Sequence, residues 1–119
     1  MIYHLTYRKN WKYSLATGPY TAKSLEKEGY IHCSTATQLV PVAKDFFPGR
    51  RTLTILVIDE TLLTSPLKWE APSGGTPPPG VPNKDKFPHV YGPINHEAVV
   101  KTLDMERNAD DLFVLPDNL

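Results

Sequence analysis

Hydrophobic and polar residues alternate along several short stretches of the chain, which is the pattern of half-buried strands. In residues 1–8, Tyr3, Leu5 and Tyr7 fall on one face, and Ile2, His4 and Thr6 fall on the other. Residues 52–59 are instead an almost continuous β-branched and aliphatic run, typical of a central strand covered on both faces. Further short strands are expected at residues 30–34, 67–70, 89–91, 99–105 and 112–115, although residues 99–105 also suit a helix.

Helical patterns are fewer and lie in the first half of the chain. Residues 21–28 predict a short helix that Thr21 caps and Gly29 ends. A second helix is predicted by apolar residues at helical spacing, namely Leu39, Val42, Ala43, Phe46 and Phe47. Pro41 should delay or kink this helix. Residues 8–19 are expected to be irregular, and Asn95 can cap a single turn through Ala98.

Strands therefore outnumber helices, and this order favours an α+β domain rather than a doubly wound one. We expect a split mixed or antiparallel sheet with a few short helices, in one domain over residues 1–119. A proline- and glycine-rich loop at residues 71–86 interrupts the second half. A loop of this length is typical either of a lid over a site or of a mobile insert.

Charge and cysteine content narrow the function classes. Thirteen basic residues balance thirteen acidic ones, so no net field favours general nucleic-acid binding or a membrane surface. The single cysteine, Cys33, cannot form an intramolecular disulfide, which fits a reducing compartment. With neither a signal-like segment nor a membrane-length apolar run, the expected location is the cytoplasm. The oligomeric state expected is a monomer or a weak homodimer.

Residues 28–35 carry the strongest chemical signal, because they predict a helix end, a short strand and a helix start in close succession. Alternation places Tyr30, His32 and Ser34 on one strand face and Cys33 on the other, with the core. Since buried polar groups need partners, this polar face indicates a site. His32 and Cys33 point to opposite faces and so cannot act as base and thiolate.

Histidines are the main candidates for functional residues. His4, His32 and His89 lie on predicted strands beside aromatic residues, whereas His96 resembles a surface or capping residue. Each of the three, taken singly, suits a hydrogen-bonded structural role. Taken together, they predict a cleft where imidazoles meet ribose hydroxyls or move a proton. A zinc or iron site built from these three histidines is the alternative, but short-range ligand spacing is absent.

Three further residues have both a structural and a functional interpretation. Glu70, after Trp69, suits either an exposed edge carboxylate or a general base. Trp11 and Tyr13 suit either packing over the sheet or an aromatic wall for a planar ring.

Blocks spread over nearly the whole chain resemble a small bacterial family, domain of unknown function 952. The most specific are His32-Cys33-Ser34 and Phe87-Pro88-His89-Val90-Tyr91-Gly92-Pro93, together with Ile2-Tyr3-His4-Leu5, Leu56-Val57-Ile58-Asp59 and Trp69-Glu70. The resemblance implies an ADP-ribosyltransferase-like fold, in which a split sheet holds NAD in a cleft. It places His4 at the ribose of the nicotinamide half and His32 at the nicotinamide side.

The same resemblance leaves one element of that superfamily unmatched. A late strand there usually carries a glutamate, and the corresponding residues 89–92 offer no carboxylate. The pattern instead resembles the histidine-histidine-apolar branch, which includes RNA 2′-phosphotransferases, although basic residues for a phosphorylated RNA end are missing.

Two functions are therefore expected as alternatives. The first is a transferase-like enzyme or NAD glycohydrolase acting on NAD, ADP-ribose or a related nucleotide. His4, Trp11, Tyr30, His32 and Ser34 would then bind ligand, and His32, His89, Tyr91 and Glu70 would supply acid or base chemistry. The second is an inactive module that binds a nucleotide or small metabolite. In either case the partner is a small molecule, with NAD as a substrate rather than a resident cofactor, and a metal-dependent enzyme is the weaker third option.

Overall fold

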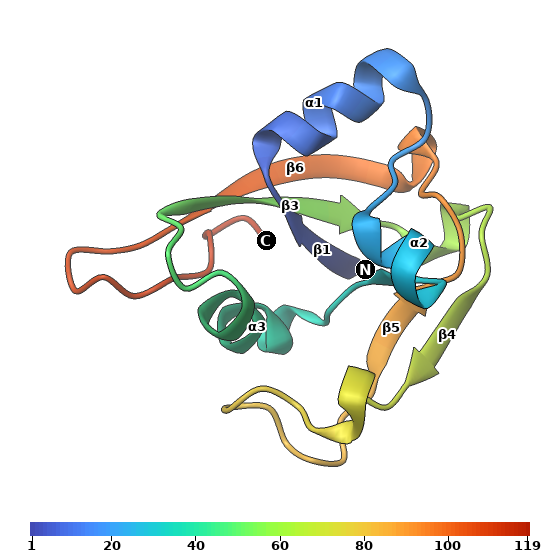
Figure 1. Cartoon of the computed structure of the whole chain (residues 1–119). Coiled ribbons are helices and arrows are strands. Elements are labelled where there is room, and N and C mark those ends of the chain that lie inside the picture. Colours follow the sequence, from blue (N-terminus) through green and yellow to red (C-terminus); the bar gives the residue numbers. More distant parts are fainter.

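Two three-stranded antiparallel sheets and three short helices make up the fold (Figure 1). The structure is a computed structural model that describes all 119 residues. The first sheet has the order β1-β3-β6, with β1 (Ile2–Thr6), β3 (Thr52–Ile58) and β6 (Val99–Glu106). The second has the order β2-β5-β4, with β2 (Ile31–His32), β5 (Phe87–Val90) and β4 (Leu67–Glu70). The helices are α1 (Arg8–Thr17), α2 (Lys23–Glu28) and α3 (Leu39–Phe46). The predicted α+β class is confirmed.

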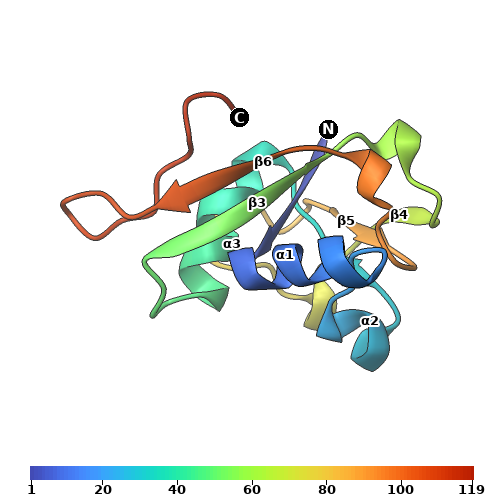
Figure 2. The same ribbon diagram turned by 90° about the horizontal axis from the view of Figure 1, so that it is seen from above.

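Strand β3 is the centre of the first sheet, as its continuous apolar run predicts. It pairs with β1 on one side and with β6 on the other (Figure 2). Its residues alternate between two separate cores, with Leu56 and Ile58 in one and Ile55 and Val57 in the other. Because both faces of this strand are covered, every residue after Thr52 is buried, and Thr54 is the one polar residue among them.

The two cores are closed by different elements. Helix α3 packs Leu39 and Ala43 on the face of the sheet that carries Tyr3 and Leu5. The opposite face receives the second sheet, through Ile31, Cys33 and Val90, together with Tyr20. Helix α1 lies on this second side, so α1 and α3 are on opposite sides of the first sheet (Figure 1). No helix is both long and apolar enough to span a bilayer.

Helix α1 corrects the expectation that residues 8–19 are irregular. Ser14 is its only buried residue, so no apolar stripe with helical spacing marks it in the sequence. The segment contains neither proline nor glycine until Gly18, and its lysine, leucine and alanine residues favour a helix. Trp11 packs this helix against the core, but one such contact leaves no periodic pattern in the sequence.

Smaller corrections concern the element ends. Helix α2 begins at Lys23 after Ala22, not at a Thr21 cap, but it ends at Gly29 as predicted, with φ 90°. Helix α3 begins at Leu39, so Pro41 does not delay it. Pro41 falls in the first turn, where a backbone N–H has no partner within the helix and its loss costs little.

The other strands differ mainly in length. The predicted strand at residues 30–34 shortens to β2, with Ser34 forming a single bridge to Tyr3. Residues 99–105 form a strand, not the alternative helix. The last predicted strand, at residues 112–115, is wrong, because only Phe113 pairs, through one bridge to Arg107. The 71–86 segment contains one 3₁₀ turn, Ser73–Gly75, and otherwise lacks helix or strand.

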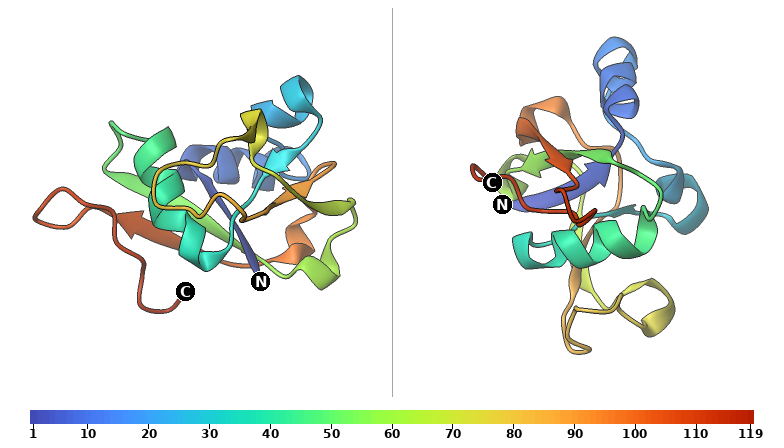
Figure 3. Two further views of the ribbon diagram at one scale, coloured as in Figure 1. Left: turned by 90° about the horizontal axis from the view of Figure 1, so that it is seen from below. Right: turned by 90° about the vertical axis from the view of Figure 1, so that its left-hand side faces the viewer.

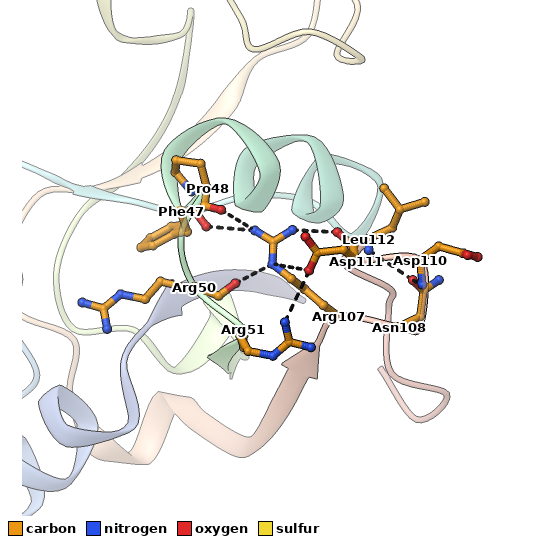
Figure 4. Close-up of polar contacts among 9 residues, drawn as sticks. All are labelled: Phe47, Pro48, Arg50, Arg51, Arg107, Asn108, Asp110, Asp111 and Leu112. Atoms are coloured by element: carbon orange, nitrogen blue, oxygen red, sulfur yellow. Dashed lines mark hydrogen bonds and ion pairs between the residues drawn. The ribbon is translucent and has the colours of Figure 1, made fainter.

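Arg107 ties the end of α3 to the chain after β6 (Figure 4). Its guanidinium donates to the carbonyl oxygens of Pro48 at 2.8 Å, Arg50 at 2.6 Å and Asp111 at 2.9 Å. The guanidinium also lies 4.1 Å from the ring centre of Phe113. These contacts satisfy carbonyl groups beyond the helix end, which would otherwise lack partners.

We predict that Arg107→Met lowers the free energy of unfolding by about 2 kcal/mol, because methionine keeps the aliphatic stem and loses the charged donors. Urea unfolding measures this change. Arg51→Met is the matched control, since Arg51 makes only an exposed ion pair to Asp111 at 3.5 Å and should change stability by less than about 0.5 kcal/mol. Equal losses of unfolding free energy in the two variants would contradict the role of Arg107 in tying the end of α3 to the chain after β6.

Candidate functional site

A cleft of about 410 Å³ opens between α3, the 71–86 loop and strands of both sheets. The loop lies beside α3 on the lower side of the molecule (Figure 3). Sixteen residues line the cleft: His4, Leu5, Ser24, Glu28, His32, Cys33, Ser34, Val42, Phe46, Phe47, Pro72, Ser73, Thr76, Pro78, Phe87 and His89. All three histidines that the sequence singles out are among them.

Pairing between β2 and β5 places His32 directly opposite His89. Residues paired across antiparallel strands share a face, so both imidazoles leave the sheet on the same side, with ring centres 5.5 Å apart. Tyr30 stacks on His89 at 4.1 Å and meets the edge of His32 at 5.0 Å. The sequence prediction that Tyr30 and His32 share a face is confirmed.

His89 is held by a carboxylate. Its Nδ1 lies 2.8 Å from Glu70 Oε1, and the Tyr91 hydroxyl donates to the same oxygen at 2.5 Å. The hydrogen bonds from Tyr91 and His89 lower the pKa of Glu70, and the bond to Glu70 raises the pKa of Tyr91 to about 12. An ionised Glu70 requires the proton of neutral His89 on Nδ1. In that tautomer Nε2 carries no proton and has no hydrogen-bond partner within the protein, in a side chain that is 2% exposed and lines the cleft.

His32 is held by a second carboxylate. Its Nε2 lies 3.0 Å from Glu28 Oε2, and the Ser73 hydroxyl donates to that oxygen at 3.1 Å. Partial burial opposes ionisation of Glu28, but the hydrogen bonds from His32 and Ser73 outweigh it and lower the pKa. The site therefore contains two adjacent carboxylate–histidine pairs, and one of them reaches the 71–86 loop.

His4 faces inward, unlike the other two histidines of the cleft. Its Nδ1 lies 2.6 Å from the carbonyl oxygen of His32, and its Nε2 lies 2.8 Å from the Tyr20 hydroxyl. A carbonyl only accepts, so Nδ1 carries the proton and Nε2 accepts from Tyr20. The Tyr20 oxygen in turn lies 2.8 Å from the hydroxyl of Thr6. Both ring nitrogens are thus used within the protein.

Burial lowers the pKa of His4 to about 4. The ring stays neutral near pH 7, and it contributes a carbon edge rather than a free nitrogen to the cleft. Cys33 also lines the cleft from the core side, and burial raises the pKa of its thiol. Its predicted place in the core is confirmed.

Two other residues predicted to bind ligand, Ser34 and Trp11, lie in different places. Ser34 lines the cleft, and its backbone bridges to Tyr3. Trp11 lies outside the cleft, on α1, where it packs on Tyr20 and on His96. Tyr13 is on the same helix, 71% exposed. His96, predicted to be a surface or capping residue, is half-buried, and its Nε2 is buried without a hydrogen-bond partner.

Several cleft residues carry no sequence signal for a site. Phe46 is part of an apolar helical pattern that indicates core, yet 65% of it is exposed. Phe87 and Ser73 come from segments whose approach depends on the tertiary fold. Glu28 could have been found, because it precedes His32 by four residues across a helix end and a turn.

No cluster of three or more histidine, cysteine, aspartate or glutamate side chains is arranged to hold a metal ion. The three-histidine arrangement fails for a geometric reason, because both nitrogens of His4 are committed to protein partners.

Comparison with known proteins gives one family. Residues 5–102 match the model of a family described as Protein of unknown function (DUF952). The crystal structure of protein CC0527 from Caulobacter crescentus is 31% identical, with a TM-score of 0.77 over 98% of this chain and 96% of that one. The solution structure of CC0527 is 31% identical, with a TM-score of 0.74 over 99% and 95%. No curated protein matches the chain.

We predict that His4 makes folding stability depend on pH between about 6.5 and 4. The unfolded chain protonates this imidazole below pH 6.5, and the folded chain does so only near pH 4. The stabilisation is therefore complete above pH 6.5 and is lost as the pH falls, by about 3 kcal/mol. Unfolding curves of the wild type and His4→Gln measure it. A parallel loss of stability in both proteins would contradict this assignment.

Proposed function

The chain belongs to the DUF952 family, and we propose that it acts on a nucleotide such as NAD or ADP-ribose in the histidine cleft. The observation that carries this proposal is the pair of adjacent imidazoles, His32 and His89, each held by its own carboxylate. The ADP-ribosyltransferase-like fold is part of the same proposal. Two separate antiparallel sheets that both contribute strands to one cleft support it.

Cleft size and chemistry suit a ligand of this class. Small-molecule sites have volumes of roughly 300–1,000 Å³ and combine apolar walls with a few placed polar groups. Phe46, Phe47 and Phe87 form the apolar part and suit a planar ring. Ser24 and Ser34 add hydroxyl groups that can bond to a sugar.

The reaction that fits these residues is hydrolysis of an N-glycosidic bond. His89 Nε2 accepts a proton from water as the water oxygen bonds to the anomeric carbon of the ribose. The bond from that carbon to the ring nitrogen breaks, and its electron pair leaves with the base. Glu70 stabilises the imidazolium that forms on His89, as a carboxylate does behind a catalytic histidine.

A binding module without turnover is the second candidate, and two observations favour it. Glu70 is not among the residues that line the cleft, so no carboxylate from β4 or β5 can contact a bound ribose directly. His4, which the resemblance assigns to ribose binding, has no free ring nitrogen. Glu28 is the only carboxylate of the cleft wall, and it comes from the end of α2.

We predict that His32→Ala abolishes binding of NAD and ADP-ribose and leaves the fold stable, because 42% of this side chain is exposed. Thermal shift with each ligand measures binding, and unfolding of the free protein measures stability. Tyr13→Ala, on an exposed part of α1, is the control and should bind as the wild type does. A loss of several kcal/mol in His32→Ala would instead mark this histidine as structural.

We predict that Glu70→Gln slows nicotinamide release from NAD by roughly 10²-fold and changes ligand binding little. The glutamine cannot stabilise the imidazolium of His89, but it can still accept its Nδ1 proton. Following nicotinamide release and thermal shift on the same samples separates the two candidate functions. A shift without release in the wild type supports the binding module. Absence of both would overturn the proposal.

A further inference from the structure

Charges in the cleft define the ligand more closely than its shape does. Resting on the proposed function, we infer that the cleft selects an unphosphorylated nucleoside and discriminates against the same nucleoside with a 5′-phosphate. NAD would then enter through its nicotinamide riboside end, with both phosphates outside the cleft.

No lysine or arginine lines the cleft. Glu28 supplies a carboxylate there, and Glu70 places a second one 2.8 Å from His89, behind the ring. When His32 and His89 are neutral, Glu28 is the one charged side chain in the cleft wall and leaves it negative, whereas Lys68 lies close enough to Glu70 to offset part of that second charge. When the imidazoles are protonated, each is already paired with its own carboxylate and adds no net positive charge.

Two helices reach the cleft, and neither brings a cation to it. Helix α2 lines the cleft with Ser24 and with Glu28, its last residue, and α3 lines it with Val42 and Phe46. Glu28 is the only charged side chain among these four, so the helices add negative charge to the cleft wall and no positive charge.

Nearby cations are used elsewhere. Arg107 donates to backbone carbonyls beyond α3, and Arg50 lies 4.3 Å over the ring of Tyr7. Lys68 lies 4.6 Å over the ring of Tyr91. Lys27, Lys44 and Lys86 are on segments that border the cleft, but all three are exposed and none lines it.

The remaining lining suits the base and the sugar of a nucleoside. Phe46, Phe47 and Phe87 offer apolar contact for a base, and a positively charged nicotinamide ring gains further from aromatic faces. Glu28 and the serine hydroxyls accept hydrogen bonds from ribose hydroxyls. The same Glu28 repels a phosphate, so one residue both binds the sugar and sets the discrimination.

Calorimetry with matched pairs tests this inference: nicotinamide riboside against nicotinamide mononucleotide, and adenosine against AMP. At about 20 mM salt each nucleoside should bind at least tenfold more tightly than its phosphate, and the ratio should shrink at about 500 mM salt because screening weakens the repulsion. Glu28→Gln should reduce the ratio, and Glu28→Lys should reverse it. Glu26→Gln, an exposed change on the same helix, is the control and should keep the wild-type ratio.

The outcomes separate this inference from the proposed function. Equal or tighter binding of the 5′-phosphates would overturn the selectivity and leave a nucleotide-binding cleft standing. A ratio that Glu28→Lys does not change would show that the charge of the cleft does not set it, and would also overturn the inference. Absence of binding by all four compounds to folded protein would overturn both proposals.

Discussion

The hydrogen bond from His4 Nδ1 to the carbonyl oxygen of His32 joins the two sheets at the point where the site is built. Strand β2 is only two residues long, so it has few ladder bonds of its own. His4, on the first sheet, gives this strand a partner in addition to its pairing with β5. Because an unpaired buried carbonyl is costly, the position of His32 depends on a histidine that is itself buried and neutral.

Much of the sheet structure could be predicted from local pattern, because burial on one or both faces leaves a direct trace in the sequence. The alternation in β1 and the apolar run in β3 predicted both strands, and β3 has the central place that its run indicates. The alternation also predicts a half-buried β1, whereas all five of its residues are buried. Helix α1 left no such trace, since it buries only Ser14. The strand prediction for residues 112–115 failed for the opposite reason. Its apolar pattern is typical of a strand, but only Phe113 is part of a core, and it pairs through a single bridge to Arg107.

The candidate site was predictable in part. Alternation placed Tyr30 and His32 together, and strand position pointed to His89. The direction of His4 was not predictable, because its inward turn depends on Tyr20, which packs from a separate segment. The contribution of Phe46 depends on where α3 ends relative to the 71–86 loop, and hydrophobic spacing describes only the helix itself.

Glu28 Oε2 accepts hydrogen bonds from both His32 and Ser73, so a single oxygen atom serves an imidazole and the covering loop at once. A hydroxyl group that replaced Ser73 as the donor to this oxygen would leave the hydrogen bond of His32 in place and remove the one that ties the Ser73 side chain to α2. The contact that positions His32 is thereby independent of the contact that holds the loop.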